Sequence, residues 1–478
     1  MTQSRKSTRE TGAIVVTILA LMIFFSTMIL GLVAVAEANL SRARGRIMLL
    51  QAQYAAESGA DAAIAELNAS AVDPPTYAGT GSDVTLLDTG QYRATYNTTV
   101  VDNGDNKERV ITAVGKVYDP ASSSTPSYTR TIRVTANRTS TTTASSIMSR
   151  NIIDIASGVK NIIGKEIYVN GYINIPKNTT NLIAEKITVA GSNPSSADCS
   201  LGPNGSSHGN LVPPASYSDP SQTTTIVNLA HKNCLVPIAD PSKFTVTENI
   251  SSISTIKSIY IPWSQYMDGT YQSSPGGCSD WTTGTSPRTI PSTGNTKKTH
   301  YPNSGSGVLS TCGTSGNLAL GSATYNITDN VHIRANLCAS SSCTPTFNNP
   351  DSSTKYVFVE GTINFGAVYT PAGSGPIVFI SYAADPPSKT SVCPLGGSIY
   401  LGDSNNTIAP AAYFLATNGI CLDKTKFGAD PALGGVGGKN IYVSTSPGTP
   451  FDLTLDPNFP VDDIPIDLAW RAVYYERL

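Results

Sequence analysis

Few side chains in this chain are spaced in a way that would support catalysis. The four histidines form neither an H-x-x-x-H nor an H-E-x-x-H pattern, so the zinc-hydrolase motif is missing. They are His208, His231, His300 and His332. The run Gly434–Lys439 is similar to a phosphate-binding loop, but Leu433 and Asn440 stand where that loop needs a glycine and a hydroxyl. We predict instead that these glycines form tight corners between strands.

Carboxylates are frequent enough to supply a general acid and a general base, yet no pair stands out by its spacing. Some β-solenoid proteins are polysaccharide lyases or hydrolases, but a fold alone does not establish an activity. We therefore predict that the protein is not an enzyme and has no catalytic, cofactor-binding or metal-binding residues. A membrane-tethered enzyme that acts on polysaccharides is kept as an alternative.

The composition is typical of exported proteins that are rich in β-strands and turns. Of the 478 residues only 14% are charged, whereas about 25% is usual for globular chains. Serine, threonine, asparagine, glycine and proline fill the difference. The net charge of -2 gives no field that attracts nucleic acid, so no such partner is predicted. We expect two or three structural units from this length.

The eight cysteines all lie in the second part of the chain, after residue 198. An even number in an exported chain favours disulfides, and no C-x-x-C pair supports a zinc site. Buried free thiols are the alternative. The sequence does not define the pairing, although Cys338 and Cys343 are near neighbours. The candidate disulfide cysteines are Cys199, Cys234, Cys278, Cys312, Cys338, Cys343, Cys393 and Cys421.

An apolar run without a charged side chain, Ala13–Ala36, follows a short basic leader at residues 1–12. At about 1.5 Å per residue, a helix over this run crosses a ~30 Å hydrocarbon core. The chain then continues without proline as far as residue 73. We predict one helix over residues 13–69, with its transmembrane half at 13–36.

The leader ends in a small residue, Gly12, placed before the apolar run rather than after it. This order resembles the type IV prepilin leader, which prepilin peptidase removes on the cytoplasmic side while the apolar helix stays on the mature protein. The resemblance implies a processing junction between Gly12 and Ala13. The alternative is an uncleaved signal anchor. Both interpretations predict a single-pass inner or plasma membrane protein whose bulk is extracytoplasmic.

The end of the predicted helix carries the motif Tyr54-Ala55-Ala56-Glu57-Ser58-Gly59, followed by an alanine-rich stretch that ends at Leu67. Together with the leader and the span, over about residues 5–68, this motif resembles PilX-type minor pilins. The family motif maps to Tyr54, Glu57, Ser58 and Gly59. The resemblance implies a helix that leaves the bilayer and enters a fibre by exchanging lipid for other pilin-type subunits.

Two positions depart from that family. Ala13 is the first residue of the implied mature protein, where the family more often has phenylalanine. Thr17 is the fifth, where most pilins have a glutamate that is thought to neutralise the amino terminus of the adjacent subunit. A span without that carboxylate is easier to hold as a monomer. This difference indicates a rare or fibre-end subunit rather than the repeating one.

Three equally spaced glycines, Gly31, Gly45 and Gly59, recur about every four helical turns and so lie near one face. Small residues let helix backbones approach each other closely. We predict that these glycines mark a helix-packing face. The alternative is that the alanine-rich helix packs only on its own β-domain.

Downstream of Pro74 and Pro75, which cannot continue the helix, the hydrophobic pattern changes to a period of two. We predict an antiparallel β region over 74–138, with a turn at Asp102–Asn106. Residues 139–150 are rich in threonine and serine and are predicted to be a linker.

An internal repeat follows the linker. The segment Ile167–Ile175 aligns with Val357–Phe365, with shorter echoes at Ile399–Asp403 and Ile441–Val443. Strand, glycine corner and strand recurring in this way favour a β-solenoid over residues 151–192 and 321–478. A β-sandwich with similar hairpins is the alternative. We predict that residues 193–320 form a cysteine-containing surface insertion.

These features together predict an α+β fold, with a long N-terminal membrane-spanning helix on a small antiparallel sheet, followed by a β-solenoid outer domain. The implied function is that of a structural minor-pilin-like subunit of a type IV pilus or related fibre, at the cell surface. Its outer domain is expected to serve assembly, adhesion or sensing. The expected partners are membrane lipid, other pilin-type subunits, prepilin peptidase and a surface glycan or protein ligand. A static membrane-anchored adhesin is the first alternative.

Overall fold

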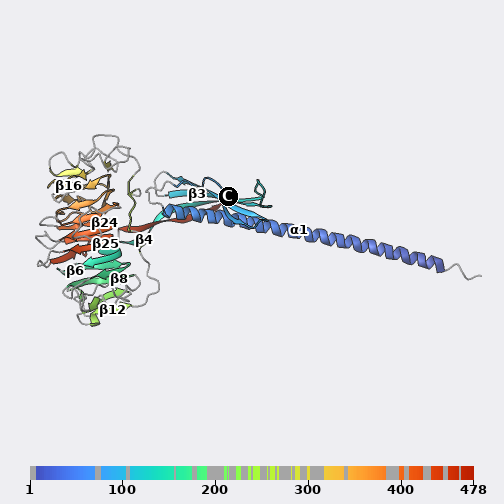
Figure 1. Cartoon of the computed structure of the whole chain (residues 1–478), viewed down its shortest axis with the longest axis horizontal. Coiled ribbons are helices and arrows are strands. Elements are labelled where there is room, and N and C mark those ends of the chain that lie inside the picture. Colours follow the sequence, from blue (N-terminus) through green and yellow to red (C-terminus); the bar gives the residue numbers. More distant parts are fainter. Residues whose placement is uncertain are drawn as a thin grey trace, which may run out of the picture. The chain divides into compact units, whose positions relative to one another are not determined.

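The structure is a computed structural model that describes residues 7–69, 77–103, 108–155, 158–174, 180–190, 209–212, 214, 222–227, 235–237, 241–247, 256, 259–263, 266–267, 281, 286–290, 299–301, 317–338, 343–383, 398–402, 408–423, 432–444, 451–461 and 464–478. The chain divides into two compact units. The helix–sheet unit contains Met1–Asn103, Glu108–Asn137 and Trp470–Leu478. The parallel-strand unit contains Arg138–Ala469 (Figure 1).

A single helix, α1 (Ser7–Ala69), forms the N-terminal part of the helix–sheet unit. Its 63 residues correspond to a length of about 95 Å. The absence of proline and the many alanines and leucines favour this continuous helix. The prediction of one unbroken helix over 13–69 is confirmed, and α1 begins earlier, within the basic leader.

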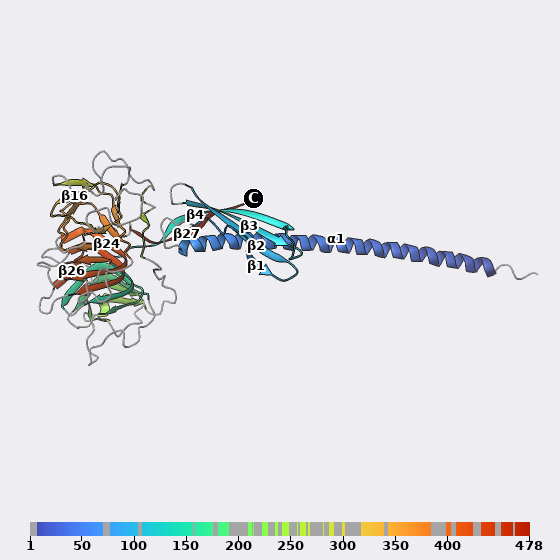
Figure 2. The same cartoon turned by 45° about the horizontal axis from the view of Figure 1, so that its top comes forward.

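The sheet of this unit has the strand order β1-β2-β3-β4-β27 and covers the second half of α1 (Figure 2). The first four strands are antiparallel neighbours, as the sequence predicts. Burial alternates residue by residue along β3, so one face packs on the helix. The strands are β1 (Val84–Asp88), β2 (Arg93–Asp102), β3 (Glu108–Tyr118), β4 (Tyr128–Thr143) and β27 (Pro465–Arg477).

Two boundaries in this sheet differ from the prediction. Strand β4 runs to Thr143 and so takes up the first part of the predicted linker over 139–150, because threonine is also a good strand former. The chain end, which the sequence places in the outer domain, returns as β27 to the edge of this sheet. The Leu478 N–H donates to the carbonyl of Thr131 at 3.1 Å. The parallel-strand unit is therefore an insertion in the sequence between two neighbouring strands.

The second unit consists of strands that pair in parallel with segments farther along the chain. The pairs recur through the unit, from β10–β12 to β14–β17. Its elements are β5 (Ile147–Ile155), β6 (Val159–Val169), β7 (Tyr172–Asn174), β8 (Asn181–Val189), β9 (Gly209–Val212), β10 (Thr224–Val227), β11 (Leu235–Pro237), η1 (Pro241–Lys243), β12 (Phe244–Thr247), β13 (Arg288–Ile290), β14 (Thr299–Tyr301), β15 (Asn317–Leu318), β16 (Thr324–Ile327), β17 (Val331–Ile333), β18 (Asn336–Leu337), β19 (Thr346–Asn348), β20 (Lys355–Val359), β21 (Ile363–Phe365), β22 (Ile377–Ser381), β23 (Ile399–Leu401), β24 (Ile408–Asp423), β25 (Ala432–Ser444) and β26 (Phe451–Leu455).

The segments that align in sequence occupy the same two columns of this stack. One column joins Val357, Phe379, Phe414, Val436, Ile147 and Ile167, each paired with the next. The other joins Ile363, Ile399, Ile420, Ile441, Ile153 and Ile173. All of these side chains belong to one buried core. The echoes at Ile399 and Ile441 therefore match the second strand of the repeat and not the first.

The chain enters this stack in its middle. Strand β25, near the end of the unit, pairs with β5, the first strand of the unit. Strands β10 and β12 extend the stack beyond β8, and β14 extends it beyond β17. Parts of the predicted surface insertion at 193–320 thus contribute to the parallel sheet. The prediction missed these strands because they are short and separated by polar segments, which gives little periodic signal.

The glycines of Gly434–Lys439 lie inside strand β25 and do not form corners as predicted. A Cβ on Gly434 would overlap the ring of Phe459, and one on Gly435 would overlap the ring of Tyr413. The glycines therefore leave room for two buried aromatic side chains.

Candidate assembly interface on helix α1

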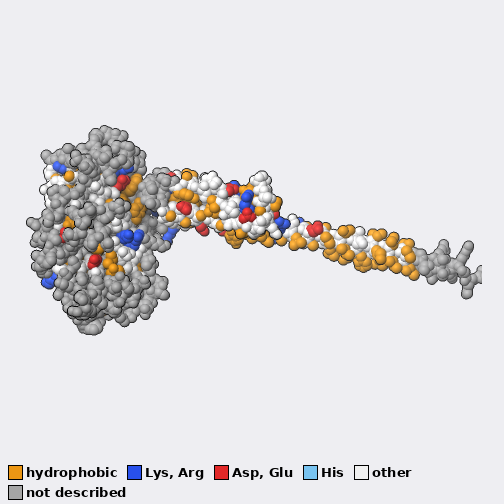
Figure 3. Space-filling model, viewed as in Figure 1, with side chains coloured by type: hydrophobic (Ala, Val, Ile, Leu, Met, Phe, Trp, Pro, Cys, Tyr) orange, Lys and Arg blue, Asp and Glu red, His pale blue; other side chains and the backbone are white. Residues whose placement is uncertain are grey.

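The first half of α1 exposes a continuous apolar surface (Figure 3). By length and composition this is a helix that could cross a membrane, and none of its most apolar window is buried. Leu30 is 68% exposed and Phe24 62%. A surface this large and apolar is unfavourable in water, so it requires lipid or other helices around it.

Two threonine hydroxyl groups in this half have partners within the helix. Thr17 donates to the carbonyl of Ala13 at 2.9 Å, and Thr27 donates to the carbonyl of Phe24 at 2.8 Å. Such bonds satisfy a hydroxyl in hydrocarbon without a second subunit. The predicted processing junction, Gly12 and Ala13, lies within the helical backbone of α1. Cleavage at this junction stays a prediction.

The three glycines of the predicted packing face have different surroundings. A Cβ on Gly59 would lie 2.8 Å from the ring of Tyr96, so Gly59 packs on its own sheet. A Cβ on Gly45 would lie 3.4 Å from the hydroxyl of Tyr128, at the end of the sheet. No atom lies within 4 Å of a Cβ placed on Gly31. Only Gly31 is therefore open to a neighbouring helix at close range.

The alanines of the second half make the closest contact between helix and sheet. Ala52, Ala56 and Ala60 are fully buried. Opposite them on β3, a Cβ on Gly115 would overlap the carbonyl oxygen of Ala52 and lie 2.5 Å from the nitrogen of Ala56. Small residues on both sides thus bring the two backbones into direct contact.

The residues of the family motif divide between the two sides of α1. Gly59 is buried against the sheet, whereas Tyr54 is 61% exposed. Glu57 and Ser58 are half-buried, and Glu57 accepts a hydrogen bond from Gln53 at 2.8 Å. The motif therefore combines an intramolecular contact with a side that faces away from the sheet.

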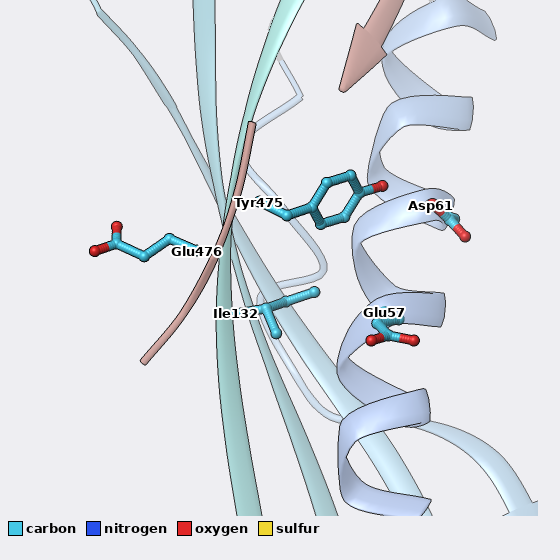
Figure 4. A pocket seen from close by; sticks show the side chains of 5 residues that line it. All are labelled: Glu57, Asp61, Ile132, Tyr475 and Glu476. Atoms are coloured by element: carbon cyan, nitrogen blue, oxygen red, sulfur yellow. The ribbon is translucent and has the colours of Figure 1, made fainter. Parts of the chain in front are cut away.

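A cleft of about 320 Å³ lies between α1 and the end of β27, inside the helix–sheet unit. Tyr475 extends from β27 toward the helix, where Glu57 and Asp61 stand one turn apart (Figure 4). Ile132 of β4 lies on the sheet side of the cleft, below Tyr475 in this view, and Glu476 extends away from the helix (Figure 4). Sequence reasoning placed Glu57 in a family motif but did not predict this cleft.

Two of the carboxylates that line the cleft act on the hydroxyl of Tyr475. Partial burial, together with the charges of Asp61 and Glu57, raises the pKa of the Tyr475 hydroxyl above its ordinary value. The phenol therefore stays protonated at neutral pH. An aromatic ring beside two carboxylates is an arrangement that attracts a guanidinium or ammonium group.

The structure accounts for three of the eight candidate cysteines. Cys338 and Cys343 form a disulfide, and Cys421 is also disulfide-bonded. The prediction of disulfides is confirmed for these three. The other candidates lie outside the described residues; they are Cys199, Cys234, Cys278, Cys312 and Cys393.

Within the described part of the chain no group of three or more His, Cys, Asp and Glu side chains is arranged to hold a metal ion. His332 is fully buried, with its Nε2 atom 3.2 Å from Glu360 and its ring stacked on Trp263 at 4.6 Å. Burial raises the pKa of Glu360, but hydrogen bonds and charges from His332 and Arg334 outweigh it and lower the pKa overall. His208 and His231 lie outside the described residues.

No protein-family model and no curated protein matches this sequence. Among solved structures, the chain is similar to the competence-associated pilin ComZ from Thermus thermophilus, with 12% identity and a TM-score of 0.36. The match covers 90% of this chain and 97% of ComZ. A likeness of this strength does not establish a shared fold, so the function is inferred from helix α1 and its surroundings.

Proposed function

We propose that this protein is a minor-pilin-like structural subunit of a type IV pilus or related fibre. Its N-terminal helix is held in the bilayer after synthesis and then exchanges lipid contacts for contacts with other pilin-type subunits. The observation that supports this most is the division of α1 into a fully exposed apolar half and a half packed on a sheet.

The sequence motif and the structure support this proposal independently. The PilX-type resemblance rests on the leader, the span and the motif around Glu57. In the structure, the half of α1 that carries this motif packs on its sheet through alanines that are fully buried. A static anchor needs only the span, whereas a long helix with a sheet-covered second half suits a subunit that packs its first half among sibling helices.

We further propose that the parallel-strand unit is a β-solenoid displayed at the cell surface for adhesion, assembly or sensing. Parallel pairs such as β5–β6 and β6–β8, in which Ile147, Ile167 and Ile187 succeed one another, support stacked coils. The extracytoplasmic location of this unit is supported by the disulfide between Cys338 and Cys343, because disulfides persist in oxidising compartments.

Mass spectrometry of the mature N-terminus tests the proposal. The full chain is expressed in a bacterium that has a prepilin peptidase, and protein is isolated from membranes and from sheared surface fibres. We expect the mature chain to begin at Ala13 and to be present in the fibre fraction. Gly12→Leu, which replaces the small residue before the junction, is expected to leave the leader in place, and Ser7→Leu is the control that is expected to be processed normally.

Two results would contradict the proposal and point to the alternatives. Recovery of an intact Met1 with no protein in the fibre fraction indicates a static membrane-anchored adhesin. Activity on glycans that is lost when a single Asp or Glu is changed indicates a polysaccharide-active enzyme.

A further inference from the structure

A segment of the parallel-strand unit lies across its strands instead of joining the sheet. We call residues 256–267 the strap; its described residues are 256, 259–263 and 266–267, and none of these belongs to a strand. Its apolar side chains pack on one outer side of the stack, where alternate residues of the strands point away from the main core. The buried members of this contact are Ile256, Ile259, Ile261 and Met267 from the strap and Met148, Phe358, Ile380 and Leu415 from the strands.

Side chains attach the strap near its start and its middle. Asn170, which directly follows β6, accepts a hydrogen bond from the N–H of Ile256 at 2.9 Å and donates one to the carbonyl of the same residue. The hydroxyl of Tyr382 donates to the carbonyl of Ile261. From β6 to β17 the strap passes six strand spacings, about 29 Å. Because these contacts come from side chains, the far end of the strap can detach without breaking a strand ladder.

The far end of the strap is a turn at residues 263–267, the end turn, which covers two aromatic side chains. Tyr266 packs on Tyr356, with ring centres 4.3 Å apart, and on Phe358, with ring centres 5.7 Å apart. Asn330 donates a hydrogen bond to the carbonyl of Tyr266 at 3.4 Å. Tyr356 is 6% exposed and Phe358 is fully buried. Detachment of the end turn would therefore uncover an aromatic surface.

His332 of β17 lies beneath the end turn, and its side chain can change charge near neutral pH. The imidazole ring is fully buried and stacks on Trp263, with ring centres 4.6 Å apart. Its Nε2 atom is 3.2 Å from Oε1 of Glu360, and the Nε atom of Arg334 is 3.4 Å from the same oxygen. The position paired with His332 on β14 is occupied by His300. Both histidines gain positive charge in acid.

The carboxylate beside His332 also serves a guanidinium. Burial raises the pKa of Glu360, but its contacts with His332 and Arg334 outweigh burial, so Glu360 is ionised at neutral pH. Since Arg334 shares this carboxylate, a proton on His332 puts a second cation beside one anion, in a position from which the end turn excludes water. Burial of that extra charge is unfavourable. The indole face of Trp263 attracts a cation only weakly in comparison.

We propose that the end turn is a pH-sensitive cover, which stays on the stack while His332 is neutral and detaches when His332 gains a proton. On detachment His332 reaches water, which stabilises its charge. The released form therefore binds the proton more readily, so the covered form is favoured above the ordinary histidine pKa of about 6.5 and is lost as the pH falls below it.

The phenol beside this latch does not take part in the titration, because burial raises the pKa of Tyr266 and keeps it neutral. Acid would thus expose the rings of Tyr356 and Phe358 as a binding surface on this unit. The inference goes beyond the proposed function, since every group involved belongs to the parallel-strand unit.

Hydrogen exchange of the full-length chain in detergent tests this cover. Protection factors, which are corrected for the effect of pH on the intrinsic exchange rate, are compared at pH 7.5 and pH 5.5 by mass spectrometry. In the peptide over residues 259–267 we expect about a tenfold loss of protection at pH 5.5, with strands β20 and β22 unchanged. His332→Phe cannot take up a proton, and a ring is already present at the paired position, Phe358. This variant is expected to keep its protection at both pH values.

Arg334→Gln tests the shared carboxylate. The change leaves Glu360 to pair with the imidazolium, so the loss of protection at pH 5.5 should shrink to less than about threefold. Lys160→Gln removes a positive charge from an exposed position on β6 and is the matched control. It is expected to show the same tenfold loss as the unmodified chain.

Equal protection of the strap at both pH values, or higher protection in acid, overturns the inference. A tenfold loss that persists in His332→Phe also overturns it, because another group such as His300 would then be responsible. Simultaneous loss of protection in β20 and β22 does so too, since the whole unit then opens. If His332→Phe already lowers the protection of these strands at pH 7.5, Arg334→Gln decides, and an undiminished tenfold loss in it overturns the inference. Processing at Ala13 and entry into fibres are measured separately, so the pilin role stands or falls on its own test.

Discussion

The side-chain amide of Asn68 and the main chain of Trp470 are joined by two hydrogen bonds, although the residues are 402 positions apart. The Trp470 N–H donates to Asn68 Oδ1 at 2.7 Å, and Asn68 Nδ2 donates to the Trp470 carbonyl at 3.2 Å. The side-chain amide thus pairs with the N–H and the carbonyl of Trp470 as a residue of a neighbouring strand would. The Trp470 ring is buried, with the guanidinium of Arg109 5.1 Å from its centre. The end of α1 therefore fixes the strand on which the cleft depends.

Replacing Asn68 with alanine should loosen β27. The change leaves the N–H and carbonyl of Trp470 without these partners, which is expected to cost about 1–3 kcal/mol locally. Hydrogen exchange measured by mass spectrometry should show faster exchange in residues 470–478. Asn103→Ala, which removes a hydrogen bond between exposed Asn103 and Glu108, is the control and should leave these amides unchanged. Equal exchange in Asn68→Ala and the unmodified chain would show that other contacts hold β27.

Gly115→Ala should separate α1 from the sheet. The added methyl group would overlap the main chain of Ala52, and main-chain atoms cannot rotate away as a side chain can. We expect a loss of about 1–3 kcal/mol in the free energy of unfolding of the helix–sheet unit. Urea unfolding followed by hydrogen exchange of β3 measures it. Gly321→Ala, at a site with no atom within 4 Å of the new Cβ, should have little effect.

Cys338 should tolerate glycine better than alanine. Its φ is 60°, in the left-handed region that disfavours every residue with a Cβ. Both substitutions break the disulfide with Cys343 and remove the sulfur atom that accepts a hydrogen bond from the Leu320 N–H. Glycine, unlike alanine, also adopts this left-handed backbone conformation without a steric cost. The thermal unfolding midpoint should rank unmodified chain, then Cys338→Gly, then Cys338→Ala, with about 1 kcal/mol between the two variants. The reverse order of the two variants would show that the left-handed backbone is not strained.

The contact of Asp83, the residue directly before β1, with strand β3 should weaken in acid. Burial raises the pKa of Asp83, but hydrogen bonds from Lys116 and Tyr118 outweigh it, so the pKa lies below its usual value. Lys116 Nζ is 2.7 Å from Asp83 Oδ1, and Tyr118 donates to Oδ2 at 3.0 Å. A carboxylate whose pKa is lowered by folding stabilises the fold above the unfolded pKa of about 3.9, and the stabilisation is lost as the pH falls through the folded value.

Asp83→Asn should therefore reduce stability at neutral pH by about 1 kcal/mol and change it little at low pH. Hydrogen exchange of β1 and β2 between pH 7 and pH 3 measures the difference between the two chains. The difference should shrink as the pH falls below about 4. A difference that is constant across this range would show that the charge of Asp83 is not the cause. Glu66→Gln, on the exposed end of α1, is the control.

Helix α1 and the first strands were predictable because their signals are local. An uncharged run, the absence of proline and a change to a period of two are readable within a few residues. The antiparallel pairing of β2 with β3 was also predictable, since the Asn103-Gly104 sequence favours a hairpin and Asp102 is paired with Arg109; most of the predicted turn itself lies outside the described residues. These features need no knowledge of distant parts of the chain.

The cleft and the return of β27 were not predictable by the same reasoning. The end of the chain has residues that favour strands, such as Val473 and Tyr475, but nothing local says which strand they pair with. The repeat shows the same limit. By sequence the echoes at Ile399 and Ile441 fit either strand of the repeat, because both strands share an Ile-x-hydrophobic pattern, and only the pairing assigns them to the second.

The insertion of a whole unit between β4 and β27 has a mechanical consequence. Any pulling force on that unit divides between two covalent connections, one through each strand, before it reaches α1. The share carried by β27 passes sideways through its hydrogen bonds to β4, which must be sheared together along the strand before it detaches. A unit held through two strands in this way would stay attached under tension better than one that is held through a single strand.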